Sequence, residues 1–367
     1  MPKRRPAKKR SPAAAVLLAV LCLLLLAVSR YLDSRSESAA SVLAPEAAQA
    51  DAPKLEVHFL DIGQGDSALL FCGDETLLID GGKVKNNQKL IARLKELEVD
   101  HLDAVICSHP DEDHCGGLSA VLASTRTDAF YCSVDSWHTK VFSDVTKYVE
   151  QQGISVTVPQ AGDSFAFGEA SVEFLGPVED YGDDPNEGSL VARVRYGETS
   201  FLFTGDMGFE AEDDMLAAGV DVSATVLKVA HHGSAGSSST EFLQAVHPQY
   251  AVISVGADND YGHPTEAALN RLAACGIPVY RTDLLGEIIA VSDGKTVTMT
   301  TASSEAPSAD AASQTTDSYG YVGNSSSKVV HLAGCGKLPG ESNRVYFASL
   351  DEALAAGYRK HASCLGS

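Results

Sequence analysis

The sequence predicts an α/β protein whose main domain contains two β-sheets with helices on the outside. Between residues 54 and 300, short apolar segments typical of strands alternate with segments of helical periodicity. Several of the strand-like segments between residues 154 and 206 follow one another closely, as antiparallel strands do. Strands paired in this way, together with helices that present one apolar face, favour two sheets covered by outer helices.

The expected elements follow from these patterns in chain order. The expected strands cover residues 55–63, 67–72, 76–82, 103–108, 154–159, 170–176, 189–197, 199–206, 224–234, 250–256 and 278–283. The expected helices cover residues 87–99, 212–219, 240–246 and 265–276. In the first of these helices the spacing of Leu90, Ile91, Leu94 and Leu97 places all four on one face.

Size and charge limit the possible functions. The chain has 367 residues, 44% of them hydrophobic, which is enough for one large domain or two domains. The formal net charge is -21, and the first ten residues alone contain six basic side chains, so the remainder carries 22 basic and 49 acidic residues, or -27. This argues against a broad basic surface for nucleic acid, and a phosphate substrate would need metal ions or local basic groups.

The N-terminus has the pattern of a targeting segment. A basic cluster precedes the apolar run 13–28, which is long for a signal peptide and slightly short for a membrane span. We expect residues 1–33 to form an uncleaved signal-anchor or transmembrane segment that leaves the body outside the cytoplasm, or a cleaved signal that leaves the protein secreted. Residues 34–53 are expected to be a linker.

A second linker is expected at 301–318, where Ser, Thr and Ala dominate without periodicity. The module that follows, 319–367, is too small to be stable on an apolar core alone and needs a cross-link or a metal. The chain contains eight cysteines, and their wide spacing does not indicate a dense disulfide framework.

Three ligand-rich stretches come directly after apolar strands. They contribute His109, Asp111, Asp113 and His114, then Asp206, then His231 and His232. Any one stretch alone is equally consistent with a helix N-cap or a solvated turn, but three together favour a metal site, since zinc and manganese take imidazole and carboxylate ligands. We expect residues 109 and 111 to face one ion, residues 113 and 114 to face a second, and Asp206 to bridge the two.

These stretches resemble the metallo-β-lactamase superfamily and, more specifically, the hydrolase domain of ComEC-type competence DNA-uptake proteins. The strings "FLDIGQGDSALL", "LLIDGG", "SHPDEDHCGG", "LFTGD", "LKVAHHGS", "YGHP" and "VYRTDLLG" carry the resemblance, in order, across residues 54–300. It implies an αββα sandwich with two divalent ions at one edge and hydrolysis by a metal-bound hydroxide. Asp111 stands where the superfamily usually has histidine, which favours Mn²⁺ over strict Zn²⁺.

The resemblance also implies roles for single residues. His232 is expected to be the metal ligand and His231 to face the substrate phosphate, with the reverse left open. His263 is a candidate proton donor or phosphate contact, with a simple loop role as the alternative. Asp80 is a catalytic candidate that orients a ligand. The substrate-binding candidates are Asp66, Asn186, Ser189 and Ser234; for Asp66, with Asp61 and Gln64, a structural glycine-rich turn is an equal interpretation.

The C-terminal module, 319–367, resembles the small zinc-binding domain of Ada-type DNA repair proteins, chiefly through "ESNRVYFASLDEALAAGYR". That family binds zinc with two pairs of ligands. Here the pairs are His331 with Cys335 and His361 with Cys364, and His361 stands where cysteine is usual. The resemblance implies one structural zinc ion, and free or disulfide-paired cysteines are the alternative.

These observations together predict an outward-facing, metal-dependent phosphodiesterase of residues 54–300 that acts on DNA in the manner of a competence nuclease. The first alternative is hydrolysis of a non-nucleic surface phosphodiester such as phosphocholine. The second is a non-catalytic DNA-binding module. The expected partners are DNA or another phosphodiester, and a membrane through the N-terminal segment; the sequence indicates no protein partner.

Overall fold

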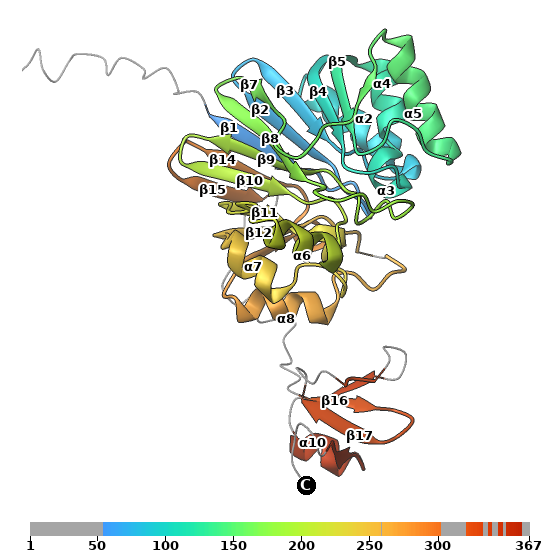
Figure 1. Cartoon of the computed structure of the whole chain (residues 1–367), viewed down its shortest axis with the longest axis vertical. Coiled ribbons are helices and arrows are strands. Elements are labelled where there is room, and N and C mark those ends of the chain that lie inside the picture. Colours follow the sequence, from blue (N-terminus) through green and yellow to red (C-terminus); the bar gives the residue numbers. More distant parts are fainter. Residues whose placement is uncertain are drawn as a thin grey trace, which may run out of the picture. The chain divides into compact units, whose positions relative to one another are not determined.

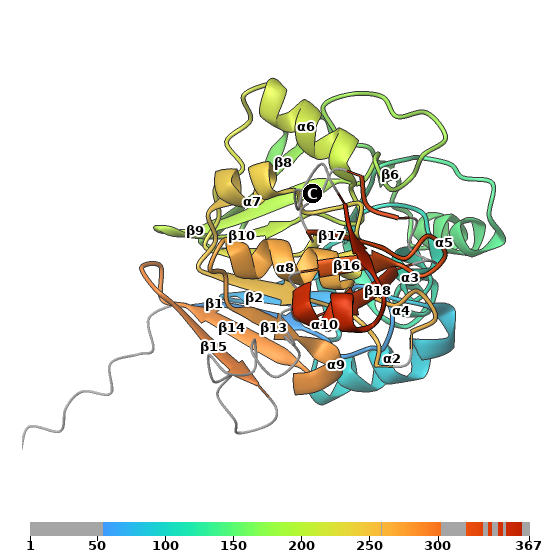
Figure 2. The same cartoon turned by 90° about the horizontal axis from the view of Figure 1, so that it is seen from below.

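The computed structural model describes residues 54–257, 259–301, 321–332, 337–339, 344–347 and 350–361. Within this part of the chain, the main domain consists of two β-sheets packed face to face, with helices on both outer faces (Figures 1 and 2). The αββα sandwich expected from the sequence is confirmed.

The first sheet combines antiparallel and parallel strands. Its order is β15 (Val297–Thr301), β14 (Ile288–Ser292), β1 (Leu55–Phe59), β2 (Ala68–Cys72), β3 (Glu75–Ile79), β4 (His101–Cys107), β5 (Arg126–Cys132) and β6 (Val156–Thr157). Strand β1 is antiparallel to β14 and β2, while β3, β4, β5 and β6 run parallel to one another. The carboxyl ends of β3 and β4 therefore lie at the same edge.

The second sheet has the same mixed character. Its order is β13 (Val279–Arg281), β12 (Tyr250–Ile253), β11 (Val226–Lys228), β10 (Thr199–Phe203), β9 (Val191–Tyr196), β8 (Ala170–Gly176) and β7 (Ser164–Phe167). Strands β10 to β13 run parallel, and β7 to β10 form antiparallel pairs. The carboxyl ends of β10, β11 and β12 are thus neighbours.

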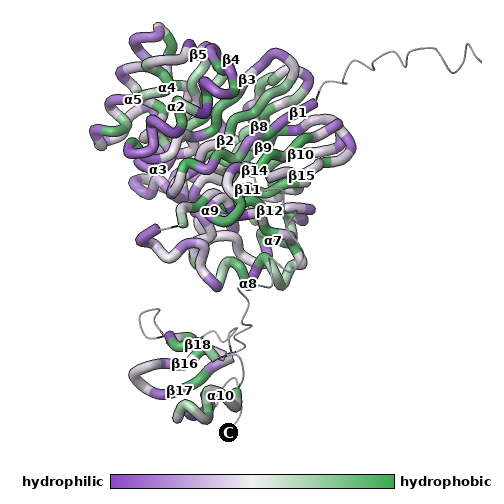
Figure 3. The backbone as a smooth tube through the Cα atoms, turned by 180° about the vertical axis from the view of Figure 1, so that it is seen from behind, coloured by the Kyte–Doolittle hydropathy of each residue, from purple (hydrophilic) through white to green (hydrophobic). Residues whose placement is uncertain are grey.

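Three apolar layers hold the sandwich together, and the strands at its centre are its most hydrophobic segments (Figure 3). Between the sheets, the rings of Phe59 and Phe203 stack with centroids 5.9 Å apart. Helices α2 (Asn87–Glu96), α4 (Leu118–Ser124) and α5 (Lys140–Gln151) pack on the first sheet, and α6 (Phe209–Ala217), α7 (Thr240–Val246) and α8 (Glu266–Ala274) pack on the second. Burial of each large apolar side chain contributes roughly 1.5–3 kcal/mol.

Short elements mark the edge where the strands end. They are the single-turn helix α3 (Glu112–Cys115), the 3₁₀ turns η1 (Val84–Asn86) and η2 (Ala230–Gly233), and the short helix α9 (Thr282–Leu285). The predicted strand 224–234 is therefore wrong in length: β11 ends at Lys228, and His231 and His232 adopt left-handed conformations with φ of 51° and 53° in η2.

Segment 154–159 is placed differently from the prediction. It was expected to belong to the antiparallel run that ends at residue 206, but β6 pairs in parallel with β5 at the edge of the first sheet. The reason is α5, which the sequence pattern did not reveal: it returns the chain across the sheet, as a crossover between parallel strands requires.

The glycine pairs 81–82 and 116–117 lie against each other next to α3. Gly117 donates its N–H to the oxygen of Gly82 over 2.8 Å, and Gly81 donates to the oxygen of His114 over 2.7 Å. A Cβ atom added at Gly117 would overlap the carbonyl oxygen of Gly81. The glycines of "LLIDGG" and "HCGG" thus allow these two loops to touch.

We expect Gly117→Ala to lower the free energy of unfolding by about 1–3 kcal/mol, because the backbone of Gly81 must move to admit the methyl group. Gly236→Ala is the matched control, since a Cβ there meets open space. Urea denaturation of both variants measures the difference. Equal stability of the two variants would contradict the proposed close packing.

The C-terminal module forms a small sheet with its own core. Its order is β18 (Arg344–Phe347), β16 (Tyr321–Asn324), β17 (Val329–Leu332) and β19 (Arg359–Lys360), with helix α10 (Leu350–Ala355). Val330, Phe347, Ala353 and Tyr358 make up the core. No helix among the described residues is long and apolar enough to cross a membrane, and the apolar run 13–28 lies outside those residues.

Candidate metal centre

Loops from both sheets meet at one edge of the sandwich. Asp80 directly follows β3, and the loop of His109 follows β4; these two strands are parallel neighbours. In the other sheet, Asp206 follows β10 and His232 follows β11, which are also parallel neighbours. The topology therefore gathers residues that are far apart in sequence, as the spacing of the three stretches predicted.

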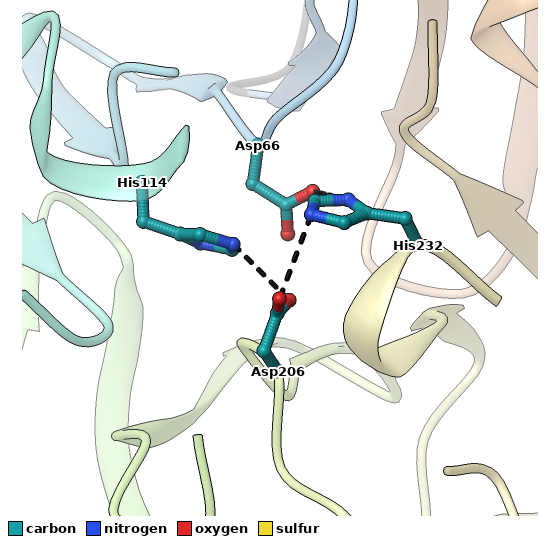
Figure 4. A group of neighbouring side chains, drawn as sticks. All are labelled: Asp66, His114, Asp206 and His232. Carbon is teal, nitrogen blue, oxygen red and sulfur yellow. Dashed lines mark ion pairs between the residues drawn. The ribbon is translucent and has the colours of Figure 1, made fainter. Parts of the chain in front are cut away.

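Four buried side chains form the centre of this cluster (Figure 4): Asp66, His114, Asp206 and His232. Each offers a ligand atom, and the four atoms all lie within 4.8 Å of one another. Both histidines point at Asp206, with His114 Nε2 3.1 Å from Oδ1 and His232 Nε2 3.5 Å from Oδ2. The arrangement makes Asp206 the common neighbour of both imidazoles.

Several buried atoms of the cluster contact other members of the cluster but make no well-aligned hydrogen bond. They are the Nε2 atoms of His109, His114 and His232, and Oδ1 of Asp66 and of Asp206. Buried polar atoms normally have partners, so a concentration of such atoms indicates a missing ligand. Imidazole nitrogen and carboxylate oxygen suit zinc and manganese, so these residues fit a candidate dimetal site.

The remaining predicted ligands border the same centre. Asp113 Oδ2 lies 3.7 Å from His232 Nε2. His109 Nε2 lies 4.0 Å from Asp111 Oδ2. Residues 109 and 111 are therefore neighbours, as expected, whereas the central group of four contains Asp66, which was expected to contact substrate, and not Asp113. The division of these residues between two ions stays a prediction.

Hydrogen-bond partners of the Nδ1 atoms orient the three histidine rings so that their Nε2 atoms face the cluster. His114 Nδ1 donates to Asp80 Oδ2 over 2.9 Å, and His232 Nδ1 donates to the oxygen of Ser254 over 2.9 Å. His109 Nδ1 lies 3.1 Å from Ser108 Oγ and 3.3 Å from Ser189 Oγ. Such partners fix the tautomer and the orientation of metal-binding imidazoles.

Asp80→Asn is expected to weaken metal binding by about 10–100-fold, because an amide replaces the carboxylate that orients His114. Asp80 also accepts bonds from the N–H and the hydroxyl of Ser108. Titration with Mn²⁺ or Zn²⁺ against a competing chelator measures the change. Asp74→Asn, at an exposed position, is the control; equal affinities in both variants would contradict this role.

Lys228 borders the cluster and was missed in the sequence interpretation. Its ammonium lies 2.7 Å from Asp66 Oδ2, and the other oxygen of Asp66 lies 3.1 Å from His232 Nδ1. Asp66, expected to be a substrate contact, is buried and belongs to the central group of four that could hold a metal ion. A lone lysine inside the apolar strand "VLKVA" was the available signal, because buried lysines are rare unless paired.

The charges of the cluster depend strongly on one another. Burial alone would lower the pKa of His232, but the carboxylates of Asp206 and Asp66 raise this pKa to about 10. Burial likewise opposes the charge of His114, yet Asp206 and Asp80 raise its pKa well above the usual value. Burial, followed by the neighbouring charge of His114, lowers the pKa of His109 to about 3. Metal binding to His114 and His232 is therefore coupled to proton release, whereas His109 is already neutral near pH 7.

Two further histidines lie on the more open side. His231 is 31% exposed at its side chain, and its Nε2 lies 3.7 Å from Asp206 Oδ2. His232, not His231, belongs to the buried group of four. The ring of His263 is 5.5 Å from that of His231, and burial, followed by the charges of His232 and His231, lowers the pKa of His263 to about 4. His263 is therefore neutral near pH 7.

Other candidates lie around the cluster or away from it. Ser189 is fully buried, and its hydroxyl accepts the N–H of Asp206 over 3.1 Å, so it supports the ligands from behind. Among the described residues, the recorded bonds of Asn186 and of the Ser234 hydroxyl stay within their own loops. Asp61 pairs with Lys89, and Gln64 accepts the N–H of Gly256.

In the C-terminal module, the rings of His331 and His361 lie 4.1 Å apart between centroids. His331 is buried, and its Nδ1 has no hydrogen-bond partner. Burial, followed by the charge of His361, lowers the pKa of His331. Cys335 and Cys364, the other two predicted ligands, lie outside the described residues.

Residues 60–257 match the family model of the Metallo-beta-lactamase superfamily. Competence protein ComA of Neisseria gonorrhoeae is 34% identical over 285 residues, covering 76% of this chain and 38% of that protein. ComE operon protein 3 of Bacillus subtilis is 30% identical over 64% of this chain and 32% of that protein. Recombination protein 2 of Haemophilus influenzae is 29% identical over 65% of this chain and 29% of that protein. The chain thus spans about a third of the length of these relatives.

Proposed function

Because this chain belongs to the metallo-beta-lactamase superfamily, we propose that it is an outward-facing, metal-dependent phosphodiesterase that hydrolyses DNA. The observation that carries the proposal is the convergence of two buried imidazole nitrogens, Nε2 of His114 and Nε2 of His232, on the buried carboxylate of Asp206. The names of the competence relatives favour DNA as the substrate.

Two divalent ions, zinc or manganese, would be held here. The residues that would hold them are His109, Asp111, Asp113, His114, Asp206 and His232, and Asp66 offers a further ligand atom at the same place. Bound divalent ions lower the pKa of water and neutralise charge on phosphate oxygens, which offsets the negative charge of the body.

The protein's own groups orient the substrate. His231 lies on the open side of Asp206, with its Nε2 atom 3.7 Å from Asp206 Oδ2, where it would face a non-bridging phosphate oxygen. His263, neutral because of its lowered pKa, is available to donate a hydrogen bond from its ring N–H to the departing oxygen. Asp80 and Ser189 keep the imidazoles in place from behind.

Two further parts of the proposal come from the ends of the chain. The basic cluster and apolar run of residues 1–33 anchor the body outside the cytoplasm, or release it if the segment is cleaved.

A structural zinc ion would be bound by His331, Cys335, His361 and Cys364 and would stabilise the C-terminal module. The adjacent rings of the two histidines favour this zinc site. Cys364→Ser should then lose one zinc equivalent per chain by elemental analysis.

The decisive assay uses the full chain in mild detergent. It is incubated with single-stranded DNA, double-stranded DNA and bis-p-nitrophenyl phosphate, with Mn²⁺, Zn²⁺ or Mg²⁺ supplied, beside Asp113→Ala. Cleavage of DNA that Asp113→Ala abolishes is the expected result. Cleavage of the small ester alone would redirect the assignment to a non-nucleic phosphodiester such as phosphocholine. If the protein bound metal but hydrolysed none of the substrates, the phosphodiesterase assignment would be wrong. The remaining assignment would then be a non-catalytic DNA-binding module.

A further inference from the structure

A chain of four side chains borders the open side of the candidate metal centre. Lys83 Nζ lies 3.8 Å from Asp113 Oδ2 and 3.2 Å from the hydroxyl of Tyr261. The ring of Tyr261 lies 5.8 Å from that of His263, which in turn lies 5.5 Å from the ring of His231. Since His231 approaches Asp206, this arc begins and ends at predicted metal ligands.

Tyr261 is the exposed member of the arc. The residue is 59% exposed, although its side chain is large and largely apolar. Its plane is inclined by only 22° to that of His263. The side-chain oxygen of Asn259 accepts the backbone N–H groups of both Tyr261 and His263, so one residue orders the loop that carries the two rings. An exposed aromatic ring beside a reactive centre is a surface on which a planar group can stack.

Lys83 determines whether a cationic or an anionic ligand fits beside Tyr261. A lysine side chain is positively charged near pH 7, so Lys83 places a cation at the hydroxyl of Tyr261. Its ammonium lies 4.9 Å from the centre of the Tyr261 ring. A quaternary ammonium headgroup needs aromatic faces free of other cations. The lysine therefore disfavours choline at this ring and favours an anionic ligand.

We propose that Lys83 and Tyr261 form a nucleoside subsite beside the scissile phosphate: the ring of Tyr261 stacks on a base, and Lys83 contacts the phosphate attached to the same nucleoside. This inference rests on the proposed phosphodiesterase function and deepens it, because it names the substrate class. A base can reach Tyr261 only when it is not stacked in a duplex, so the preferred substrate is single-stranded DNA.

Two esters with the same leaving group test the subsite. The full chain in mild detergent hydrolyses the p-nitrophenyl ester of thymidine 5′-monophosphate and methyl p-nitrophenyl phosphate, which lacks the nucleoside. Tyr261→Leu should lower the ratio of the two kcat/KM values about tenfold, as expected for loss of one base-stacking contact. Tyr261→Phe keeps the ring and should keep the ratio within about twofold. An unchanged ratio in Tyr261→Leu would overturn the subsite while leaving the phosphodiesterase function intact.

A third ester tests the role of the lysine. The wild type should have a lower kcat/KM for p-nitrophenylphosphocholine than for the thymidine ester. Lys83→Gln should bring these two kcat/KM values closer together. Lys140→Gln, which alters an exposed lysine paired with Asp144, is the matched control. A wild-type preference for the choline ester would overturn the proposal.

A binding measurement separates the subsite from the reaction. If the wild type hydrolysed none of the esters, the proposed function would fail. The subsite would then be judged by fluorescence anisotropy of a labelled, phosphorothioate-linked oligothymidine. Tyr261→Leu should weaken this binding about tenfold. Equal binding by wild type and variant would overturn the subsite.

Discussion

Asp206→Asn is expected to lower kcat for phosphodiester hydrolysis by at least about a thousandfold, since a bound metal ion contributes several kcal/mol to stabilisation of the transition state. Asp206 is the carboxylate that both His114 Nε2 and His232 Nε2 approach, at 3.1 and 3.5 Å. An amide at this position offers one weak acceptor in place of two anionic oxygens. The variant should also bind fewer metal ions per chain, as measured by elemental analysis after gel filtration.

The matched control for this variant is Asp221→Asn, because the Asp221 side chain is 67% exposed and pairs with Arg193. It should leave both kcat and metal content within about twofold of the wild type, as is usual for surface substitutions. A normal kcat in Asp206→Asn would show that Asp206 is not part of the reactive centre.

Lys228→Met is expected to lower the free energy of unfolding by about 3 kcal/mol, because it removes one of the two cationic partners of the buried carboxylate of Asp66 and leaves only His232. The ammonium and Asp66 Oδ2 are 2.7 Å apart, and both side chains are less than a tenth exposed. The chain has a single tryptophan, Trp137, which packs at the edge of the main domain's core. Its fluorescence therefore reports urea denaturation of this domain.

Two comparisons isolate the buried charge. Lys140→Met breaks the exposed pair with Asp144 and should cost no more than about 0.5 kcal/mol. The double variant Asp66→Asn with Lys228→Met should recover part of the lost stability, because no uncompensated charge remains. A Lys228→Met variant as stable as Lys140→Met would contradict the account of this ion pair.

Features that depend on neighbouring residues could be predicted from the sequence. The helix expected at 240–246 is α7, Thr240–Val246, and the hydroxyl of Ser239 caps it by accepting the N–H of Phe242. The helix expected at 87–99 ends at Glu96, shortly before Glu98 adopts a left-handed conformation with φ of 57°. Apolar spacing determines the buried face of a helix but not the residue at which it ends.

The candidate site could be predicted where it follows strand ends. His114, Asp206 and His232 lie in loops directly after apolar strands, and parallel pairing brings such loops together. The pairing of Asp66 with Lys228 could not be predicted in this way, because the two residues come from different sheets and are 162 positions apart. The assignment of β6 to the first sheet was missed for a similar reason, since alternating apolar residues do not identify a strand's partner.

The central claim is that these loops form a dinuclear metal centre. Anomalous diffraction at the manganese edge, from crystals of the full chain grown with Mn²⁺, tests it most directly. The account predicts one peak enclosed by His114, His232, Asp113 and Asp206, and a second beside His109 and Asp111. Crystals that show these side chains ordered around the site without either peak, in saturating Mn²⁺ or Zn²⁺, would contradict it.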